Sequence, residues 1–315
     1  MASLPKVLIY ATHSAPAYAE ALRMLGSPAQ LLVAQDPDEA RRLAPQADVL
    51  FSWRFPQDAY ALAHRLRWVQ SMGAGVEDIV AAEGLRRDVL VTRVVDQFGG
   101  MIAEYVFSEL LARVRRHPQL RGQQAERRWQ HIEVGTLEGS RIGVAGLGSI
   151  GREIVRKARA FDMQVYGLSR TGQSDIEVDR LVGPEGWPDF VRDLDVLVLA
   201  LPLTPDTREV VGEQVLAAMR PTSVLVNIGR GATVDQDALV RALQAGKLGG
   251  AILDVFREEP LPEQSPLWTL PGVIVTPHVS GPSIADRVAG LFHENLERFN
   301  AGKALRGLVD RRAGY

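Results

Sequence analysis

The sequence has no cysteine among its 315 residues. Disulfide bonds, cysteine nucleophiles and thiolate zinc sites are therefore excluded, and the composition fits a reducing compartment, so we expect a cytoplasmic protein. The formal net charge of −2 gives no electrostatic footprint for nucleic acid or for an anionic membrane. No apolar run approaches the roughly 18 residues of a membrane span, and the N-terminal stretch lacks the long apolar segment of a signal peptide.

What is present is an ordinary globular composition, with 46% hydrophobic and 23% charged residues, in a chain long enough for about two domains. Short apolar stretches alternate with Ala- and Leu-rich stretches of helical period. This alternation predicts an α/β fold in which helices cover parallel sheets. Strands are expected at residues 7–11, 30–34, 49–53, 68–71, 89–94, 142–145, 163–168, 196–201, 224–228, 251–255 and 273–276.

The stretch from Arg141 to Arg170 contains an apolar run, three glycines in G-x-G-x-x-G spacing, a helical stretch and a second apolar run. A dinucleotide pyrophosphate needs this order, because the glycines permit a tight turn, close approach of the backbone to phosphate, and packing of the helix on the strand. The amides and the dipole of the helix N-terminus then face the anion. The expected pyrophosphate contacts are Gly146, Leu147, Gly148, Ser149, Ile150 and Gly151.

The end of the second strand predicts which dinucleotide binds. Folds that prefer NAD place an acidic residue about 20 residues beyond the glycines, where it bonds the ribose 2′-hydroxyl. This chain has Ser169, Arg170 and Thr171 there, with no carboxylate between Met163 and Gln173. A guanidinium and two hydroxyls favour a 2′-phosphate, so we expect NADP(H) to be preferred and NAD(H) to remain possible.

Three polar residues follow three consecutive expected strands of the second half: Arg230, a glutamate at 258 or 259, and His278. Because the carboxyl ends of parallel strands share one edge, these side chains should converge where the nicotinamide would lie. Arginine can hold a carboxylate, histidine can give or take a proton near neutral pH, and a neighbouring carboxylate favours the imidazolium. The set suits hydride transfer between a nicotinamide and a 2-keto acid. No metal is expected.

The first half has its own candidate site. Residues 71–78, S-M-G-A-G-V-E-D, place two glycines in a loop after a strand, where the exposed amides of Gly73, Ala74 and Gly75 could bind a carboxylate. An ordinary turn explains this stretch equally well. Trp53 and Arg54 end the preceding strand at the same edge, either lining a pocket or stacking on the surface.

Gly99 and Gly100 are interpreted as the crossing between domains, followed by a helix over residues 101–116 that Pro118 ends. Residues 119–130 read as a solvated polar segment that Trp129 anchors, and the last helix, 283–300, is long enough to lead back to the first domain. We therefore expect a substrate domain of residues 1–98 and 287–315, similar to flavodoxin, and a dinucleotide-binding Rossmann domain of residues 99–286. The active site is expected in the cleft between them.

In order along the chain, T-L-E-G-S-R-I-G-V-A-G-L-G-S-I-G, L-P-L-T-P-D-T, V-N-I-G-R-G, L-D-V-F-R-E-E-P-L and T-P-H-V-S-G resemble the signatures of the D-isomer-specific 2-hydroxyacid dehydrogenases. The similarity covers nearly the whole chain. Ser169 departs from the Asp that the family often has, and together with Trp53 and Arg54 makes the sequence more similar to the NADPH-dependent glyoxylate/hydroxypyruvate reductase branch.

The resemblance implies a role for each matching residue. Arg230 would bind the substrate carboxylate, His278 would be the acid/base, and Glu259, which directly precedes proline as in the family, would be its partner. Asp254 would meet the nicotinamide carboxamide, and residues 73–76 would give amides to the substrate. It also implies a homodimer built through the cofactor domains. Further cofactor contacts expected on this basis are Leu201, Pro202, Thr207, Ile228 and Gly281.

The expected activity is reduction of a small 2-keto acid, such as glyoxylate or hydroxypyruvate, to a D-2-hydroxy acid. Formate dehydrogenases, which resemble this family, carry Gln in place of Glu259 and are disfavoured. Phosphite dehydrogenases keep a similar triad, so this activity remains an alternative. A cofactor-sensing module like the related transcriptional corepressors also keeps the triad, although the absence of an extended disordered tail favours an enzyme.

Overall fold

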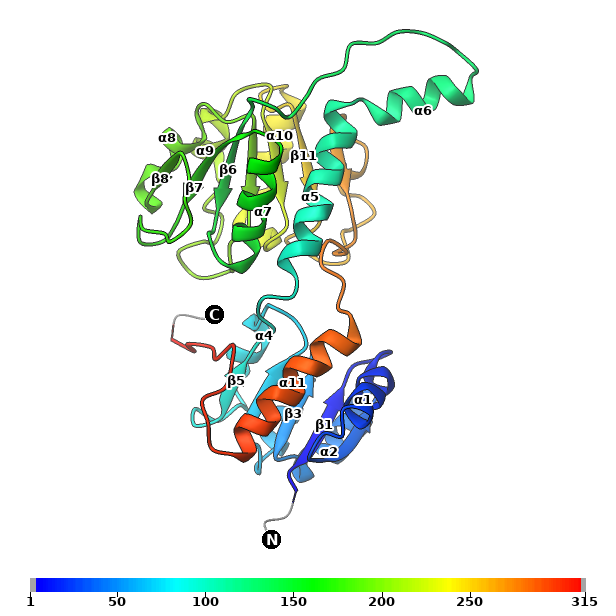
Figure 1. The fold of residues 1–315 in the computed structure, drawn as a ribbon, viewed down its shortest axis with the longest axis vertical. Helices are drawn as coiled ribbons and strands as arrows, with labels where there is room; N and C mark the ends of the chain where they lie inside the picture. Colours follow the sequence, from blue (N-terminus) through cyan, green and yellow to red (C-terminus); the bar gives the residue numbers. More distant parts are fainter. Residues whose placement is uncertain (1–3, 313–315) are drawn as a thin grey trace. The chain divides into compact units, whose positions relative to one another are not determined.

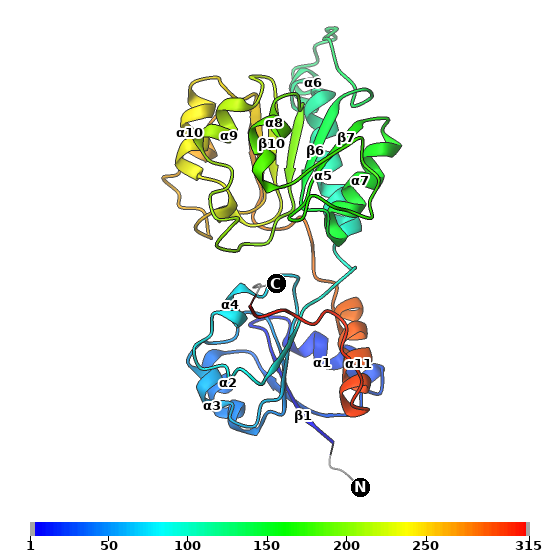
Figure 2. The same ribbon diagram turned by 90° about the vertical axis from the view of Figure 1, so that its left-hand side faces the viewer.

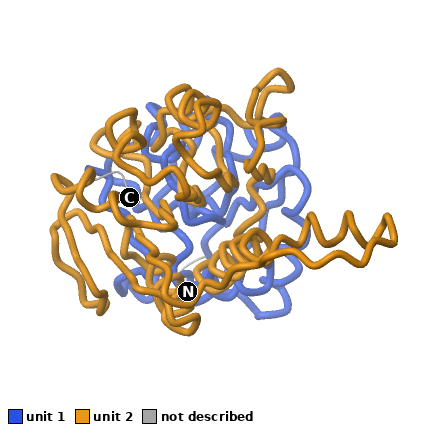
Figure 3. The backbone as a smooth tube through the Cα atoms, turned by 90° about the horizontal axis from the view of Figure 1, so that it is seen from above, with its two compact units in different colours: residues 1–97, 283–315 blue, residues 98–282 orange. Residues whose placement is uncertain are grey.

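The computed structural model describes residues 4–312, which form two compact units. Within that range, unit 1 comprises residues 4–97 and 283–312, and unit 2 comprises residues 98–282 (Figure 3). Each unit has a parallel sheet with helices on both faces (Figure 2). The predicted α/β class with two Rossmann-like sheets is confirmed. Among the described residues, no helix is long and apolar enough to cross a membrane.

Unit 1 is built on a five-stranded sheet in the order β2-β1-β3-β4-β5, the flavodoxin-like arrangement (Figure 1). Helices α1 and α11 cover one face, and α2 and α3 cover the other (Figure 2). The strands are β1 (Lys6–Tyr10), β2 (Gln30–Ala34), β3 (Val49–Ser52), β4 (Trp68–Ser71) and β5 (Leu90–Thr92). The helices are α1 (Ala15–Met24), α2 (Pro37–Leu43), α3 (Ala59–Leu62), α4 (Glu77–Val80) and α11 (Ala285–Asn300).

The last helix, α11, belongs to unit 1 although it is far from the rest of that unit in sequence. Its buried residues recur at the spacing of one helix face, and they include Phe292. The Phe292 ring stacks on Phe51 of β3 at 4.3 Å and on Trp68 of β4 at 5.1 Å between ring centroids. These aromatic contacts explain why a segment that follows unit 2 in sequence packs on the first sheet.

Unit 2 has a seven-stranded sheet in the order β12-β11-β10-β9-β6-β7-β8. Counted from its own first strand, β6, this is the Rossmann order with one strand added at the edge, and the order reverses between β6 and β9. Its strands are β6 (Arg141–Ala145), β7 (Gln164–Leu168), β8 (Arg180–Val182), β9 (Val196–Leu199), β10 (Val224–Asn227), β11 (Gly250–Leu253) and β12 (Val273–Val275).

Helices enclose this sheet, with α5 and α7 on one face and α8, α9 and α10 on the other (Figure 2). Every residue of β9, β10 and β11 is buried, as their predominantly apolar sequences predict for strands covered on both faces. The helices are α5 (Gly99–Val114), α6 (His117–Ala125), α7 (Ser149–Ala160), α8 (Trp187–Val191), α9 (Glu213–Ala218) and α10 (Gln236–Gln244). Single turns of 3-10 helix lie at Ala44–Gln46, Pro184–Gly186, Gly231–Thr233 and Pro266–Trp268.

The division between the two units lies between Gln97 and Phe98, next to Gly99 and Gly100, which form the first turn of α5. Gly99 packs so closely on α7 that a Cβ would lie 2.9 Å from the Ser149 carbonyl oxygen. Two expectations about the segment that follows are wrong. Pro118 does not end a helix but lies in the first turn of α6, where its missing N–H has no cost. Trp129 does not anchor its segment, because it is fully exposed.

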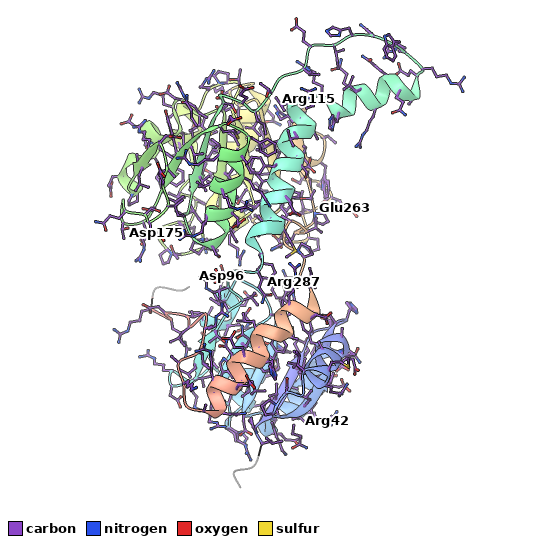
Figure 4. The ribbon with its side chains drawn as sticks, in the orientation of Figure 1. Arg42, Asp96, Arg115, Asp175, Glu263 and Arg287 are labelled. Atoms are coloured by element: carbon purple, nitrogen blue, oxygen red, sulfur yellow. The ribbon has the colours of Figure 1, made fainter. Side chains whose placement is uncertain are left out.

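Helix α6 and the segment that follows it extend away from the remainder of unit 2 (Figure 1). The arm begins beside Arg115, which is labelled at the end of α5 (Figure 4), and returns to the sheet before β6. Most residues of this arm are exposed, so the arm packs neither into the core of unit 2 nor against its sheet.

Candidate active site

The glycine turn links β6 to α7, as the spacing predicts. Gly146 has φ +96°, and a Cβ there would lie 2.6 Å from the Ala200 carbonyl oxygen, so only glycine fits. Gly151 packs directly on the Gly146 carbonyl, which brings α7 against β6. A Cβ on Gly148 would meet no atom within 4 Å, so the backbone in front of α7 faces open space. These features fit a pyrophosphate.

Helix α7 adds electrostatic support for an anion. It has twelve residues, and its first turn carries no acidic side chain, while Lys157 and Arg159 lie in its last turn. The unpaired amides and positive end of the dipole at its N-terminus lie beside the glycine turn. The basic residues at the far end are placed where they complement the negative end of the dipole.

The turn after β7 holds the residues expected at the 2′-position of the adenosine ribose. The Ser169 hydroxyl donates to the Gln173 carbonyl at 2.8 Å, and Arg170 and Thr171 are exposed. The next carboxylate, Asp175 (labelled in Figure 4), binds Arg152 of α7 at 2.8 Å, and this hydrogen bond lowers its pKa. The negative charge nearest to this turn in sequence is therefore already paired with a cation.

The segment after β9 begins with a turn, and helix α9 starts only at Glu213. Thr207 closes this turn by donating from its hydroxyl to the Pro202 carbonyl at 2.7 Å. The same hydroxyl accepts from the Thr204 amide at 2.8 Å. Leu201 and Pro202 are half-buried at the end of β9, next to the position where the strand order reverses.

Arg230 follows β10 in a turn held by its neighbours. The Asn227 side chain accepts from the Gly229 amide at 3.1 Å and donates to the Arg230 carbonyl at 3.0 Å. The Thr233 hydroxyl donates to the same carbonyl at 2.7 Å. Gly231 lies against the backbone of Phe256, with no room for a side chain. Ile228, at the start of the turn, is buried, whereas Arg230 is half-buried. Residue-based reasoning missed Asn227, whose signal was a polar residue ending an apolar strand.

His278 and Glu259 are brought together from the ends of two adjacent strands, β12 and β11. The His278 Nδ1 lies 2.9 Å from the Glu259 Oε2, while the Glu259 Oε1 accepts from the Phe256 amide at 3.1 Å. An ionised carboxylate only accepts, so the Nδ1 of His278 carries the proton of this hydrogen bond. The two side chains are 40% and 24% exposed. Together they form a hydrogen-bonded histidine–glutamate pair.

Asp254 is buried at 0% exposure directly after β11, and the turn that carries His278 is bonded to it. Its Oδ1 accepts from the Val279 amide and its Oδ2 from the Ser280 amide, both at 2.9 Å, while its carbonyl accepts from the His278 amide at 2.9 Å. His278 has φ +54°, a conformation that costs energy in a residue other than glycine. Asp254 holds that conformation in place.

The loop after β4 in unit 1 is closed by Ser71. Its hydroxyl accepts from the Gly73 amide at 3.1 Å and donates to the Gly75 carbonyl at 3.0 Å. In residues 4–312, the amides of Ala74 and Gly75 make no hydrogen bond to the protein. The Trp53 ring packs on Gly73 and leaves no space for a Cβ there. The Arg54 guanidinium lies over that ring, 5.9 Å from its centroid.

Unit 2 has three features of dinucleotide-dependent oxidoreductases. They are a Rossmann sheet, a glycine turn before a helix, and a histidine paired with a glutamate at the same edge of the sheet. Comparisons with known proteins narrow this class. Residues 107–280 match the family model of the D-isomer specific 2-hydroxyacid dehydrogenase NAD binding domain. The chain therefore belongs to the D-isomer specific 2-hydroxyacid dehydrogenase family, as the sequence motifs predict.

Similar proteins include glyoxylate/hydroxypyruvate reductases and another member of this family. Glyoxylate/hydroxypyruvate reductase A of Photorhabdus laumondii is 34% identical over 275 residues, which cover 85% of this chain and 88% of the relative. A D-isomer specific 2-hydroxyacid dehydrogenase of Xanthobacter autotrophicus, solved with NADPH and MES, is 32% identical with a TM-score of 0.89 and complete coverage of both chains. The NADPH-dependent glyoxylate/hydroxypyruvate reductase of Sinorhizobium meliloti, solved with NADP and sulfate, is 30% identical with a TM-score of 0.88, covering 99% of this chain and 100% of that one.

Proposed function

We propose that this protein reduces a small 2-keto acid, such as glyoxylate or hydroxypyruvate, to the D-2-hydroxy acid with NADPH. The observation that carries the proposal is the 2.9 Å contact between His278 and Glu259, made beside the strand that leads to Arg230. The names of the relatives point to the same reaction. A cysteine-free chain fits the reducing cytoplasm, which we propose as its location.

In this reaction the side chains bind the substrate and supply a proton. The Arg230 guanidinium pairs with the substrate carboxylate, for which its planar fork is suited. Bound NADPH supplies the hydride that the carbonyl carbon receives. The carbonyl oxygen takes the proton of the His278 Nε2. The neutral ring that remains keeps its proton on Nδ1, where it is hydrogen-bonded to Glu259. Glu259 therefore stabilises the charged imidazolium before the transfer. The backbone amides of Ala74 and Gly75 are proposed to donate further hydrogen bonds to the substrate carboxylate.

The cofactor would bind along the glycine turn of residues 146–151, with its additional phosphate at Ser169, Arg170 and Thr171. The support is the turn after β7, which carries Arg170 and no carboxylate, together with the pairing of Asp175 with Arg152. Asp254, Thr207 and Gly281 are proposed contacts for the remaining parts of the cofactor. A ratio of kcat/KM that favours NADPH over NADH is expected. Ser169→Asp should lower this ratio, because a carboxylate repels the 2′-phosphate and binds the 2′-hydroxyl.

The experiment that tests the activity is a panel of 2-keto acids with NADPH, followed by loss of NADPH absorbance, with phosphite and NADP as an additional assay. We expect turnover of a 2-keto acid, and His278→Ala should lower that turnover at least about 100-fold, the lower end of the range for loss of a general acid. NADPH affinity, measured by fluorescence titration, should survive in that variant. Turnover of phosphite alone, or cofactor binding without turnover of any acid, would contradict the proposal.

We also propose a homodimer built through unit 2. The support is the extended arm formed by α6 and the following segment, where Trp129 is fully exposed and Leu120 is 39% exposed. Size-exclusion chromatography with light scattering should give the mass of two chains. Trp129→Ser should shift the equilibrium towards the monomer, while Trp268→Ser, at a residue 50% exposed elsewhere on unit 2, should leave it unchanged.

A further inference from the structure

The turn that carries His278 is held from a second direction, by helix α5. Gly281, just beyond the turn, packs against Ile102 of this helix and against Phe98, the N-cap residue of the helix. A Cβ on Gly281 would lie 3.0 Å from Ile102. Tyr105 follows Ile102 by three positions and Phe98 by seven, so the three residues share one face of the helix. That face is directed at the segment of residues 276–281.

Tyr105 reaches this segment through a hydroxyl. Its oxygen lies 2.7 Å from the Thr276 hydroxyl, which in turn lies 2.6 Å from the Asp254 Oδ1. The direction of the chain follows from counting protons. An ionised carboxylate accepts only, so the single Thr276 hydroxyl proton goes to Asp254. Tyr105 must then donate to Thr276. The chain therefore runs from Tyr105 through Thr276 to Asp254.

The end of this chain is the carboxylate that holds the His278 turn. The Asp254 Oδ1 accepts from both Thr276 and the Val279 amide, so its orientation depends on two donors, one on each side of His278. The Thr276 carbonyl also accepts from the His278 amide at 3.0 Å. A donor from α5 prevents the Thr276 hydroxyl from rotating towards another acceptor. Helix α5 thereby contributes to the orientation of the His278 ring through Thr276 and Asp254.

We propose that Tyr105 is a positioning residue for the reduction: its hydroxyl orients Thr276 and Asp254, and through them keeps His278 in its strained, active geometry. The inference rests on the proposed function for its kinetic consequence, but the chain of contacts does not depend on that function. Burial keeps the tyrosine protonated and able to donate, since it raises the pKa of Tyr105 to about 12.

The test compares Tyr105→Phe, Thr276→Val and their double variant with the wild type, using a 2-keto acid that the wild type reduces. Tyr105→Phe should lower kcat about 5-fold, the scale of one neutral hydrogen bond, and leave the KM for the acid and the affinity for NADPH within about 2-fold. Thr276→Val should lower kcat roughly 10- to 100-fold, because a buried carboxylate loses its donor. Thr276→Ser should retain most of the activity.

The double variant should be no slower than Thr276→Val, because the tyrosine acts only through the threonine. Tyr166→Phe, at the half-buried tyrosine of β7, is the matched control and should behave as wild type. An unchanged kcat in Tyr105→Phe, or losses that multiply in the double variant, would overturn the inference. So would a fall in NADPH affinity equal to the fall in kcat, because that would indicate general damage to unit 2.

A second measurement does not require turnover. Hydrogen exchange of the peptide that covers residues 276–281 should be faster in Tyr105→Phe than in the wild type, while peptides from β6 and α7 should exchange at unchanged rates. If the wild type reduced none of the acids, the proposed function would fail while this measurement still tested the hydrogen-bond chain. Unchanged exchange at residues 276–281 would contradict the inference even in an active enzyme.

Discussion

Replacing Glu259 by Gln tests the acid/base pair at a single atom. The Glu259 Oε1 accepts from the Phe256 amide at 3.1 Å, and a glutamine can keep that bond with its own oxygen. Its NH₂ group would then be directed at the His278 Nδ1, which now lies 2.9 Å from a carboxylate oxygen. A protonated Nδ1 cannot accept from this group, so the substitution disfavours the imidazolium that the reduction requires.

The size of the effect follows from the contact and its exposure. A hydrogen bond to a charged group contributes about 1.5–3 kcal/mol, which corresponds to a factor of roughly 10 to 150. Because the two side chains are 40% and 24% exposed, solvent screening favours the lower part of this range. We expect kcat/KM for the keto acid to fall about 10- to 30-fold near neutral pH.

The matched control is the adjacent carboxylate. Glu258 is exposed and has the same charge, so Glu258→Gln removes the same unit of charge one residue away. It should leave kcat/KM close to that of the wild type. Equal effects of the two substitutions, or a Glu259→Gln enzyme with unchanged kcat/KM, would show that the pair does not act as argued.

Three further predictions concern the framework of unit 2. Gly151→Ala should abolish NADPH binding in a fluorescence titration, because a Cβ there collides with the Gly146 carbonyl; retained affinity would contradict the packing argument. Arg113→Met should lower the free energy of unfolding by about 2–4 kcal/mol in urea, because the guanidinium donates to the carbonyls of Gly249 and Gly272 and methionine leaves both without this donor. Arg115→Met, at an exposed residue, should change it little. Stability should fall as the pH rises from the unfolded tyrosine value of about 10 through the raised Tyr105 pKa of about 12. The folded protein binds this proton more tightly, so Tyr105→Phe should lack that part of the loss in alkaline unfolding curves, and an identical curve would refute the assignment.

Short-range patterns in the sequence determined a large part of this protein. The glycine spacing between two apolar runs indicated the turn from β6 to α7, because each glycine answers a local steric requirement. Predominantly apolar stretches indicated the buried strands β9 to β11. Polar residues at the ends of consecutive parallel strands indicated that a glutamate at 258 or 259 would meet His278, because chain direction places those ends at one edge. The resemblance to the family selected Glu259, which contacts His278 in the structure.

The tertiary structure decided what depends on contacts between distant segments. Nothing local indicates that Asp254 holds the turn around His278, or that Tyr105 reaches it through Thr276, because the donors and acceptors come from separate elements. The helix at Pro118 was misjudged because a proline that stops one helix suits the first turn of another equally well. Periodicity reports which face of an element is buried, whereas a hydrogen bond across the fold exists only once packing has brought its two ends together.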